Sequence, residues 1–163
     1  MIRLPLVFVA ALLLGWGAMV TDAAAQPVSR EEVLKSIAVF QKEPSSPGGF
    51  AAASTIQAFA RHSEAVHISL SKAVIPWMKG PDASDADTRK MLLAAYLAGN
   101  VEAQLKSGKA ADDPYAGWEQ VLATYAQLLH INSAAKIPEV EGLKSKSADG
   151  TLRAYAARVQ EKE

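Results

Sequence analysis

The sequence predicts an all-α fold: a single compact domain of about five helices in antiparallel arrangement, after an N-terminal signal peptide. Two observations support this fold class. Apolar residues recur at three- and four-residue steps over most of the chain, which is the spacing of one helix face. Alanine is abundant, and small side chains let helix axes approach to roughly 8–10 Å.

Residues 1–25 have the pattern of a cleavable secretory signal peptide. Arg3 precedes an uncharged apolar run over 4–20, and alanines follow at 23–25. A retained membrane anchor is the alternative, because the run lies at the lower edge of the roughly 17–25 residues that span a bilayer. The alanines favour cleavage after Ala25. We therefore expect a bacterial periplasmic or secreted protein, with no stable membrane insertion after cleavage.

The mature domain is expected at 26–163, a length suited to one hydrophobic core. The whole chain carries 17 basic and 17 acidic residues, so its formal net charge is zero. Such a chain lacks the basic surface of a nucleic-acid-binding protein and has little attraction to an anionic membrane. It has no cysteine. Disulfides and thiol catalysis are therefore excluded, and apolar packing has to supply the stability.

Local signals place the first two helices. Ser29 can cap a helix over 30–42, which ends before Pro44. The sequence PSSPGG at 44–49 is typical of a loop. A second helix is expected at roughly 50–63. Its apolar stripe consists of Phe50, Ala53, Ile56, Phe59 and Ala60.

Residues 66–71 alternate between apolar and polar side chains, which is the period of a strand with one buried side. No second strand is evident to pair with them, and an isolated strand is not stable. We expect a short extended stretch lying on the helices, or a helical continuation. A turn is expected at 76–78, with Trp77 in the core.

The third helix is expected at 86–107. Ser84 or Asp85 can cap its start, and Gly108 stands where a left-handed residue ends a helix. Gly99 lies inside this helix, although glycine there costs roughly 1 kcal/mol relative to alanine. Gly99 therefore predicts that another backbone approaches closely.

The stretch DDPYAGW, residues 112–118, contains two acidic and two aromatic residues, but its pattern is typical of the start of a helix. Asp113 can cap the helix, and Pro114 suits the first helical position. A ligand role for the two acids is the alternative. The helix is expected at 114–131, ending at Asn132. Its apolar stripe consists of Trp118, Val121, Leu122, Tyr125, Leu128 and Leu129.

The remaining chain is expected to hold one more helix. Pro138 can open a single short turn, and KSKSADG at 144–150 is typical of a polar spacer. The last helix is expected at about 150–161. Its apolar face consists of Leu152, Tyr155, Ala156 and Val159.

Few residues suggest chemistry. His62, Glu64 and His67 are a candidate metal site, but a spacing of five turns the two histidines to different sides of a helix or a strand. His130, at the end of a helix, suits the helix dipole. Paired carboxylates stand at predicted helix starts, and neither a nucleophile elbow nor a phosphate loop is present. We therefore expect no catalytic residues, no metal and no cofactor.

Three aromatic residues, Tyr96, Trp118 and Tyr125, are the candidates for lining a ligand pocket. They lie on the predicted helices 86–107 and 114–131, which should be antiparallel neighbours. Their helical spacing favours a place in the core. The hydroxyl of tyrosine and the indole N–H of tryptophan nevertheless usually form a hydrogen bond when buried. If the protein has a ligand pocket, we expect it beside these three residues.

Three short motifs, AGN at 98–100, SGK at 107–109 and YAGW at 115–118, lie around the end of one predicted helix and the start of the next. They resemble the helix A end, the turn and the helix B start of a tetratricopeptide repeat, which implies an antiparallel helical hairpin. The turn is several residues longer, and the small-residue positions of helix B are not met. No second copy occurs, and such repeats need several units. No family is therefore assigned.

The sequence favours a non-catalytic module that binds an unknown protein or peptide partner. The supporting observations are the export signal, the neutral charge, the amphipathic helices and the lack of a catalytic set. A helical carrier of a small apolar ligand is the alternative. A small metal-dependent exported enzyme, built on the histidines at 62 and 67, is a third.

Overall fold

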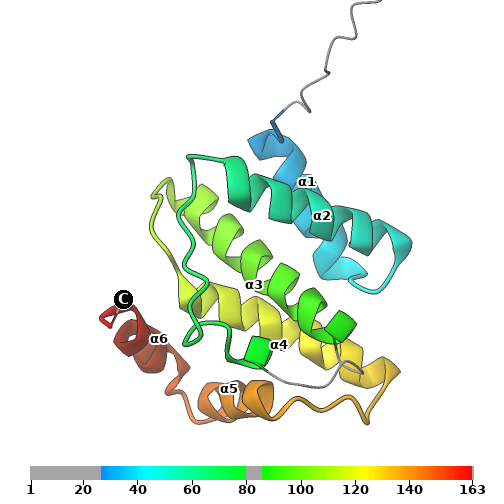
Figure 1. Ribbon diagram of the computed structural model, residues 1–163, viewed down its shortest axis with the longest axis vertical. Coiled ribbons are helices and arrows are strands. Elements are labelled where there is room, and N and C mark those ends of the chain that lie inside the picture. Colours follow the sequence, from blue (N-terminus) through cyan, green and yellow to red (C-terminus); the bar gives the residue numbers. More distant parts are fainter. Residues whose placement is uncertain (1–26, 80–85, 163) are drawn as a thin grey trace, which may run out of the picture.

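Six α-helices and one 3₁₀ turn are formed by residues 27–79 and 86–162, which the computed structural model describes (Figure 1). The elements are α1 (Arg30–Lys42), α2 (Pro47–His62), η1 (Pro76–Lys79), α3 (Ala86–Ser107), α4 (Pro114–Ile131), α5 (Pro138–Ala148) and α6 (Leu152–Gln160). No strand occurs in these two ranges, so the predicted all-α fold is confirmed. The predicted signal peptide and the predicted caps Ser84 and Asp85 lie outside the described residues.

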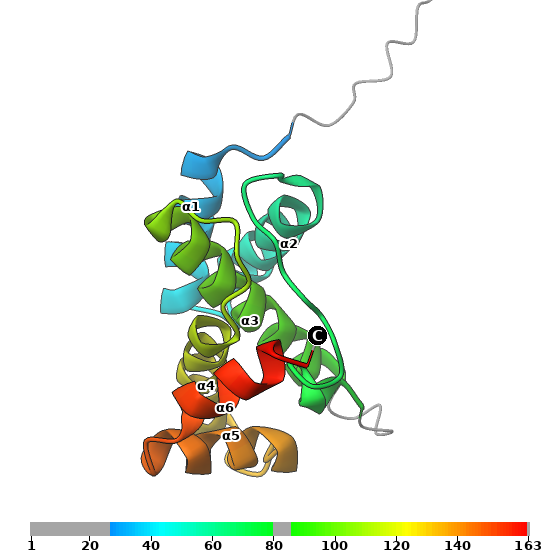
Figure 2. The same ribbon diagram turned by 90° about the vertical axis from the view of Figure 1, so that its left-hand side faces the viewer.

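The hairpin of α3 and α4 forms the middle of the molecule (Figure 2). Helices α1 and α2 pack on one side of it, and α5 and α6 pack on the other side against α4. The pairs α1–α2 and α3–α4 are antiparallel, as predicted (Figure 1). Residues 63–75, here called the strap, lead from α2 to η1. Helices α2 and α3 lie side by side and run in the same direction.

The core is one cluster of buried apolar side chains drawn from all six helices. Trp77 of η1 is fully buried, so its predicted place in the core is confirmed. Helix α3 contributes the most buried residues, because neighbours cover it on several sides. Among the described residues, no helix is both long and apolar enough to cross a membrane.

The predicted bounds of α1, α3 and α4 are confirmed. The capping and turn residues at their ends explain why these bounds could be predicted. The Ser29 hydroxyl accepts a hydrogen bond from the Glu32 N–H at 3.2 Å, which caps α1. Gly108 follows α3 with a φ of +69°, the left-handed conformation that ends a helix. A Cβ on Gly99 would overlap the carbonyl oxygen of Ala116 in α4, so the close backbone approach is also confirmed.

The expected loop at 44–49 is wrong in its second half, because α2 already begins at Pro47. The Ser46 hydroxyl accepts from the Gly49 N–H at 3.0 Å, and proline suits the first helical position. The apolar stripe expected for α2 also needs one correction. Phe50 is 53% exposed, whereas Ile56 and Phe59 are buried.

The single turn and polar spacer expected after Pro138 are wrong, since α5 continues to Ala148. This helix buries only Val140 and Leu143, so most of its side chains face solvent. A polar sequence can therefore be helical here. Gly150, with a φ of +74°, separates α5 from α6.

The strap forms neither helix nor strand over 66–71, so the expected helical continuation is wrong. It lies on α3 through hydrogen bonds at His67. Val66 is buried, but Leu70 is 49% exposed, so only part of the expected apolar side is covered.

Candidate functional site

Two side-chain amides are buried in α3. Asn100 is fully buried and Gln104 is 2% exposed. The Gln104 Oε1 accepts from the His67 N–H at 2.8 Å, and its Nε2 donates to the His67 carbonyl at 2.8 Å. The same Nε2 also donates to the Asn100 Oδ1 at 2.6 Å. Since a buried amide without partners is costly, these bonds fix the strap on α3.

Asn100 extends this network to the motif at 112–118. Its Nδ2 donates to the Asp112 Oδ1 at 2.6 Å and to the Tyr96 hydroxyl at 3.3 Å, and its Oδ1 accepts from the Asp113 N–H at 3.2 Å. The Asp113 carboxylate accepts from the Ala116 N–H at 3.0 Å, which confirms the predicted cap of α4. Both acids therefore have structural partners.

This amide network is not among the features predicted from the sequence, although the sequence contains a signal for it. Tyr96, Asn100 and Gln104 stand four residues apart, which places them on one face of α3. Two amides in line with a buried tyrosine, within an otherwise apolar helix, indicate a polar partner on that face. The identity of that partner, the backbone of the strap, is not visible in the sequence.

Trp118, a predicted ligand residue, anchors the strap at a second point. Its indole Nε1 donates to the Val74 carbonyl at 2.7 Å, and its ring stacks on Tyr155 with centroids 5.2 Å apart. The ring is fully buried. Arg89 of α3 donates to the carbonyl of Trp77, which ties down the following turn.

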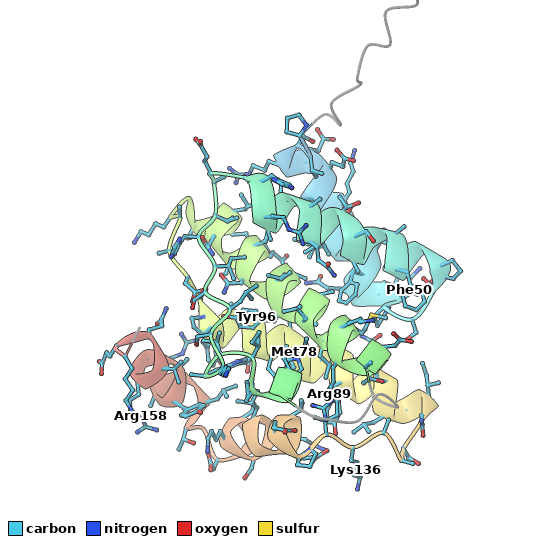
Figure 3. The ribbon with its side chains drawn as sticks, in the orientation of Figure 1. Phe50, Met78, Arg89, Tyr96, Lys136 and Arg158 are labelled. Atoms are coloured by element: carbon cyan, nitrogen blue, oxygen red, sulfur yellow. The ribbon has the colours of Figure 1, made fainter. Side chains whose placement is uncertain are left out.

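Tyr96 and Tyr125, the other two predicted ligand residues, are also buried in the core. Tyr96 lies in the middle of the molecule in Figure 3 and packs edge to face on Trp77, with centroids 6.3 Å apart. The Tyr125 hydroxyl accepts from the Ile137 N–H at 2.9 Å and donates to the Glu141 carboxylate at 3.0 Å. A ligand role for the three aromatics stays a prediction.

The environment of Tyr125 changes its acidity. Burial raises the pKa of the hydroxyl, because it disfavours the charged phenolate. The Ile137 N–H acts in the opposite direction, and the nearby Glu141 carboxylate raises the pKa further. The hydroxyl therefore holds its proton and joins the start of α5 to α4.

The candidate metal ligands His62, Glu64 and His67 are all exposed. Among the described residues, no group of three histidine, aspartate or glutamate side chains is placed to hold a metal ion. His67 contributes to the fold through its backbone and not through its ring. His130 is exposed in the last turn of α4.

A groove between α2 and α3 is the best candidate for a binding site. It consists of two hollows of about 270 and 180 Å³ that share Gln57. The larger hollow is lined by Phe50, Ala53, Ser54, Gln57, Asp87, Lys90, Met91 and Ala94. The smaller one is lined by Gln57, Ala60, Arg61, Ile68, Leu70, Leu93 and Leu97. These two sets together are called the α2–α3 groove below.

The α2–α3 groove is mainly apolar between its ends, with Ser54 and Gln57 as polar lining residues, and it is charged at its ends. Phe50, at the edge of the molecule in Figure 3, is 53% exposed, and Leu70 of the strap is 49% exposed. Asp87 and Lys90 form an exposed ion pair of 3.6 Å at one end. Arg61 is exposed at the other end, where no described residue forms a hydrogen bond or an ion pair with its side chain.

Two other hollows are more open and are bordered by paired charges. The first, of about 410 Å³, lies between α1 and α2, where Lys35 and Glu31 form an ion pair of 2.7 Å. The second, of about 470 Å³, lies between α3 and α4, where Lys106 and Glu102 pair at 2.6 Å. These two ion pairs satisfy part of the charge around each hollow, and Arg153 at the second hollow lies over the Tyr115 ring.

Comparisons with known proteins give no relative. No family model matches the chain, and neither a curated protein nor a solved structure matches it. The resemblance of 86–131 to a tetratricopeptide hairpin is therefore one of local geometry, and the α2–α3 groove has to be interpreted from its own residues.

Proposed function

We propose that this protein is an exported, non-catalytic helical module that holds an apolar segment of a protein partner in the α2–α3 groove. One observation carries the proposal: Phe50 and Leu70 leave about half of their surface exposed beside hollows lined by other apolar side chains. Covering the exposed half of either side chain would contribute about 1 kcal/mol to binding. Apolar surface that borders a groove is typical of an interaction site.

The size of the hollows favours a partner's side chains over a free small ligand. Pockets for drug-sized ligands have volumes of roughly 300–1,000 Å³. The two hollows of the groove, at about 270 and 180 Å³, are smaller and lie in a row along two helices. Two neighbouring apolar side chains of one chain segment would fill them. This supports a binding module and weighs against the alternative of a carrier.

Site-specific photocrosslinking in the exporting cell tests the proposal. A photoreactive phenylalanine analogue would replace Phe50, Leu70 or, as the matched control, Ile131. Ile131 is 72% exposed and lies outside the groove. We expect one partner protein to form adducts from positions 50 and 70 but not from 131. The purified partner should bind a Phe50→Ser variant about fivefold more weakly, as expected for a lost contact of about 1 kcal/mol.

Two results would count against the groove. Equal adducts from all three positions would indicate non-specific contact, and no common adduct from positions 50 and 70 would leave the groove without a partner. Export is tested separately by N-terminal sequencing of the protein recovered from the periplasm or the medium. We expect it to begin at Gln26, after removal of residues 1–25.

A further inference from the structure

In the middle of the strap, His67 is hydrogen-bonded to α3, whereas the three residues that follow it have free backbone groups within the described part of the chain. The side-chain amide of Gln104 forms hydrogen bonds with both the N–H and the carbonyl of His67. Ile68, Ser69 and Leu70, by contrast, form no hydrogen bond with any described residue. In a paired strand, the N–H and carbonyl of one residue point to the same side, and those of the next residue point to the other. A segment that pairs with Ile68 and Leu70 would therefore lie on the side of the strap away from Gln104.

These free groups lie beside the smaller hollow of the α2–α3 groove. The side chains of Ile68 and Leu70 line that hollow together with Leu93 and Leu97. A chain segment paired with the strap would thus place its own side chains next to an apolar depression. Backbone pairing with an exposed edge, combined with a pocket for alternate side chains, is a known mode of peptide recognition.

The positive charge of Arg61 at this end of the groove indicates which charge the bound segment should carry. Arg61 lines the smaller hollow, and its guanidinium is not neutralised by any described carboxylate. A guanidinium binds a carboxylate well, because its donors match the two oxygens. An acidic residue on the bound segment would therefore form an ion pair with Arg61.

We propose that the partner binds as an extended acidic–aliphatic segment, which pairs as a strand with Ile68 and Leu70, places an aliphatic side chain in the smaller hollow and directs a carboxylate to Arg61. This mode rests on the proposed function and adds the conformation and chemistry of the partner. A helical segment would leave the backbone groups of the strap unpaired, since a helix satisfies its own.

The probes are synthetic ten-residue peptides in which threonine alternates with varied aliphatic residues and one position is glutamate. One matched peptide carries N-methyl groups on alternate amides, which block pairing along one edge. A second carries lysine in place of glutamate, and a third has the same composition but is constrained as a helix. Binding to the processed full chain is followed by NMR and by amide hydrogen exchange.

We expect saturable binding of the glutamate peptides, with slower exchange at the amides of Ile68 and Leu70 and little change at His67, which is already bonded. N-methylation should weaken binding about tenfold, as expected for the loss of two net hydrogen bonds. The Arg61→Glu variant should prefer the lysine peptide. Leu70→Pro, which lacks the N–H, should bind more weakly than Leu70→Ala, which keeps it.

The failures of the two proposals can be told apart. Tight binding of the helical peptide, without protection of Ile68 and Leu70, would overturn the extended mode and leave the groove as a binding site. Equal binding of the N-methylated and the unmodified peptide would also overturn the extended mode. No binding by any member of the peptide set would overturn the extended mode, and the crosslinks at positions 50 and 70 would then decide whether the groove binds anything.

Discussion

The side chain of Gln104 takes the place of a neighbouring strand for His67. Its amide gives the backbone of His67 one donor and one acceptor, each at 2.8 Å. An irregular segment is thereby fixed on a helix without any sheet. The strap that borders the proposed binding groove is therefore hydrogen-bonded to one buried residue of α3 and, further along, to Trp118, while Val66 and Val74 pack into the core.

Replacement of Gln104 tests this anchor. Gln104→Leu keeps the size of the side chain but removes both hydrogen bonds to His67. We expect the free energy of unfolding to fall by about 1–3 kcal/mol, the cost of leaving buried polar groups without partners. Urea denaturation followed by circular dichroism measures the fall.

Hydrogen exchange at the His67 amide should become faster in Gln104→Leu, while the amides inside α4 keep their protection. Lys106→Leu, two residues along the same helix and exposed, is the matched control and should change stability little. An unchanged exchange rate at His67 would contradict the role assigned to Gln104.

The contact of Gly99 with α4 predicts opposite effects for two similar substitutions. In Gly99→Ala the new methyl group overlaps the Ala116 carbonyl, so α3 and α4 have to separate. Overpacking of this kind typically costs about 1–3 kcal/mol. In Gly142→Ala, within α5, no described atom beyond the adjacent backbone of the helix itself lies within 4 Å of the new methyl group. Helix propensity should then stabilise the protein by up to about 1 kcal/mol. Thermal unfolding of both variants checks the two signs.

Asp113 should stabilise the protein as a helix cap. Asp113→Ala removes the acceptor for the Ala116 N–H, and we expect a loss of about 0.5–2 kcal/mol in unfolding free energy. Asp113→Asn keeps an oxygen in place and should recover most of the loss. Equal stability of the alanine variant and the unchanged protein would show that the motif at 112–118 does not depend on this cap.

The raised pKa of Tyr125 makes stability depend on alkaline pH. In the unfolded chain, a tyrosine ionises near pH 10, whereas in the folded protein burial raises the pKa of Tyr125 above that value. Below pH 10 the hydroxyl is neutral in both states, so its contribution is fully present. As the pH rises through 10, the unfolded state loses this proton first, and stability falls.

The Tyr125→Phe variant cannot ionise at this position, so its stability should fall less steeply above pH 10. Denaturant unfolding at pH 8 and at pH 10.5 measures the difference for both proteins. Parallel pH dependence in the two proteins would be inconsistent with the burial of this hydroxyl.

The sequence alone predicted the elements whose ends are set by local chemistry. Ser29, Gly108 and Asp113 with Pro114 fix helix ends through their own backbone or side chain, whatever packs against the helix. The start of α2 was missed because a serine and a proline are equally common in loops. Helix α5 was missed because it buries too few apolar residues to show a periodic pattern.

Neither the path of the strap nor the groove beside it follows from the sequence. The sequence shows only that residue 104 is polar. That it is buried and bonded to the backbone depends on the strap, which places His67 beside α3. Phe50 reads as a core residue by spacing, and the placement of α2 beside α3 leaves it half exposed. The sequence determines where α1, α3 and α4 begin and end, because caps and turn residues act locally. The tertiary structure decides which polar groups are buried and which apolar ones stay exposed, because both depend on neighbours far along the chain.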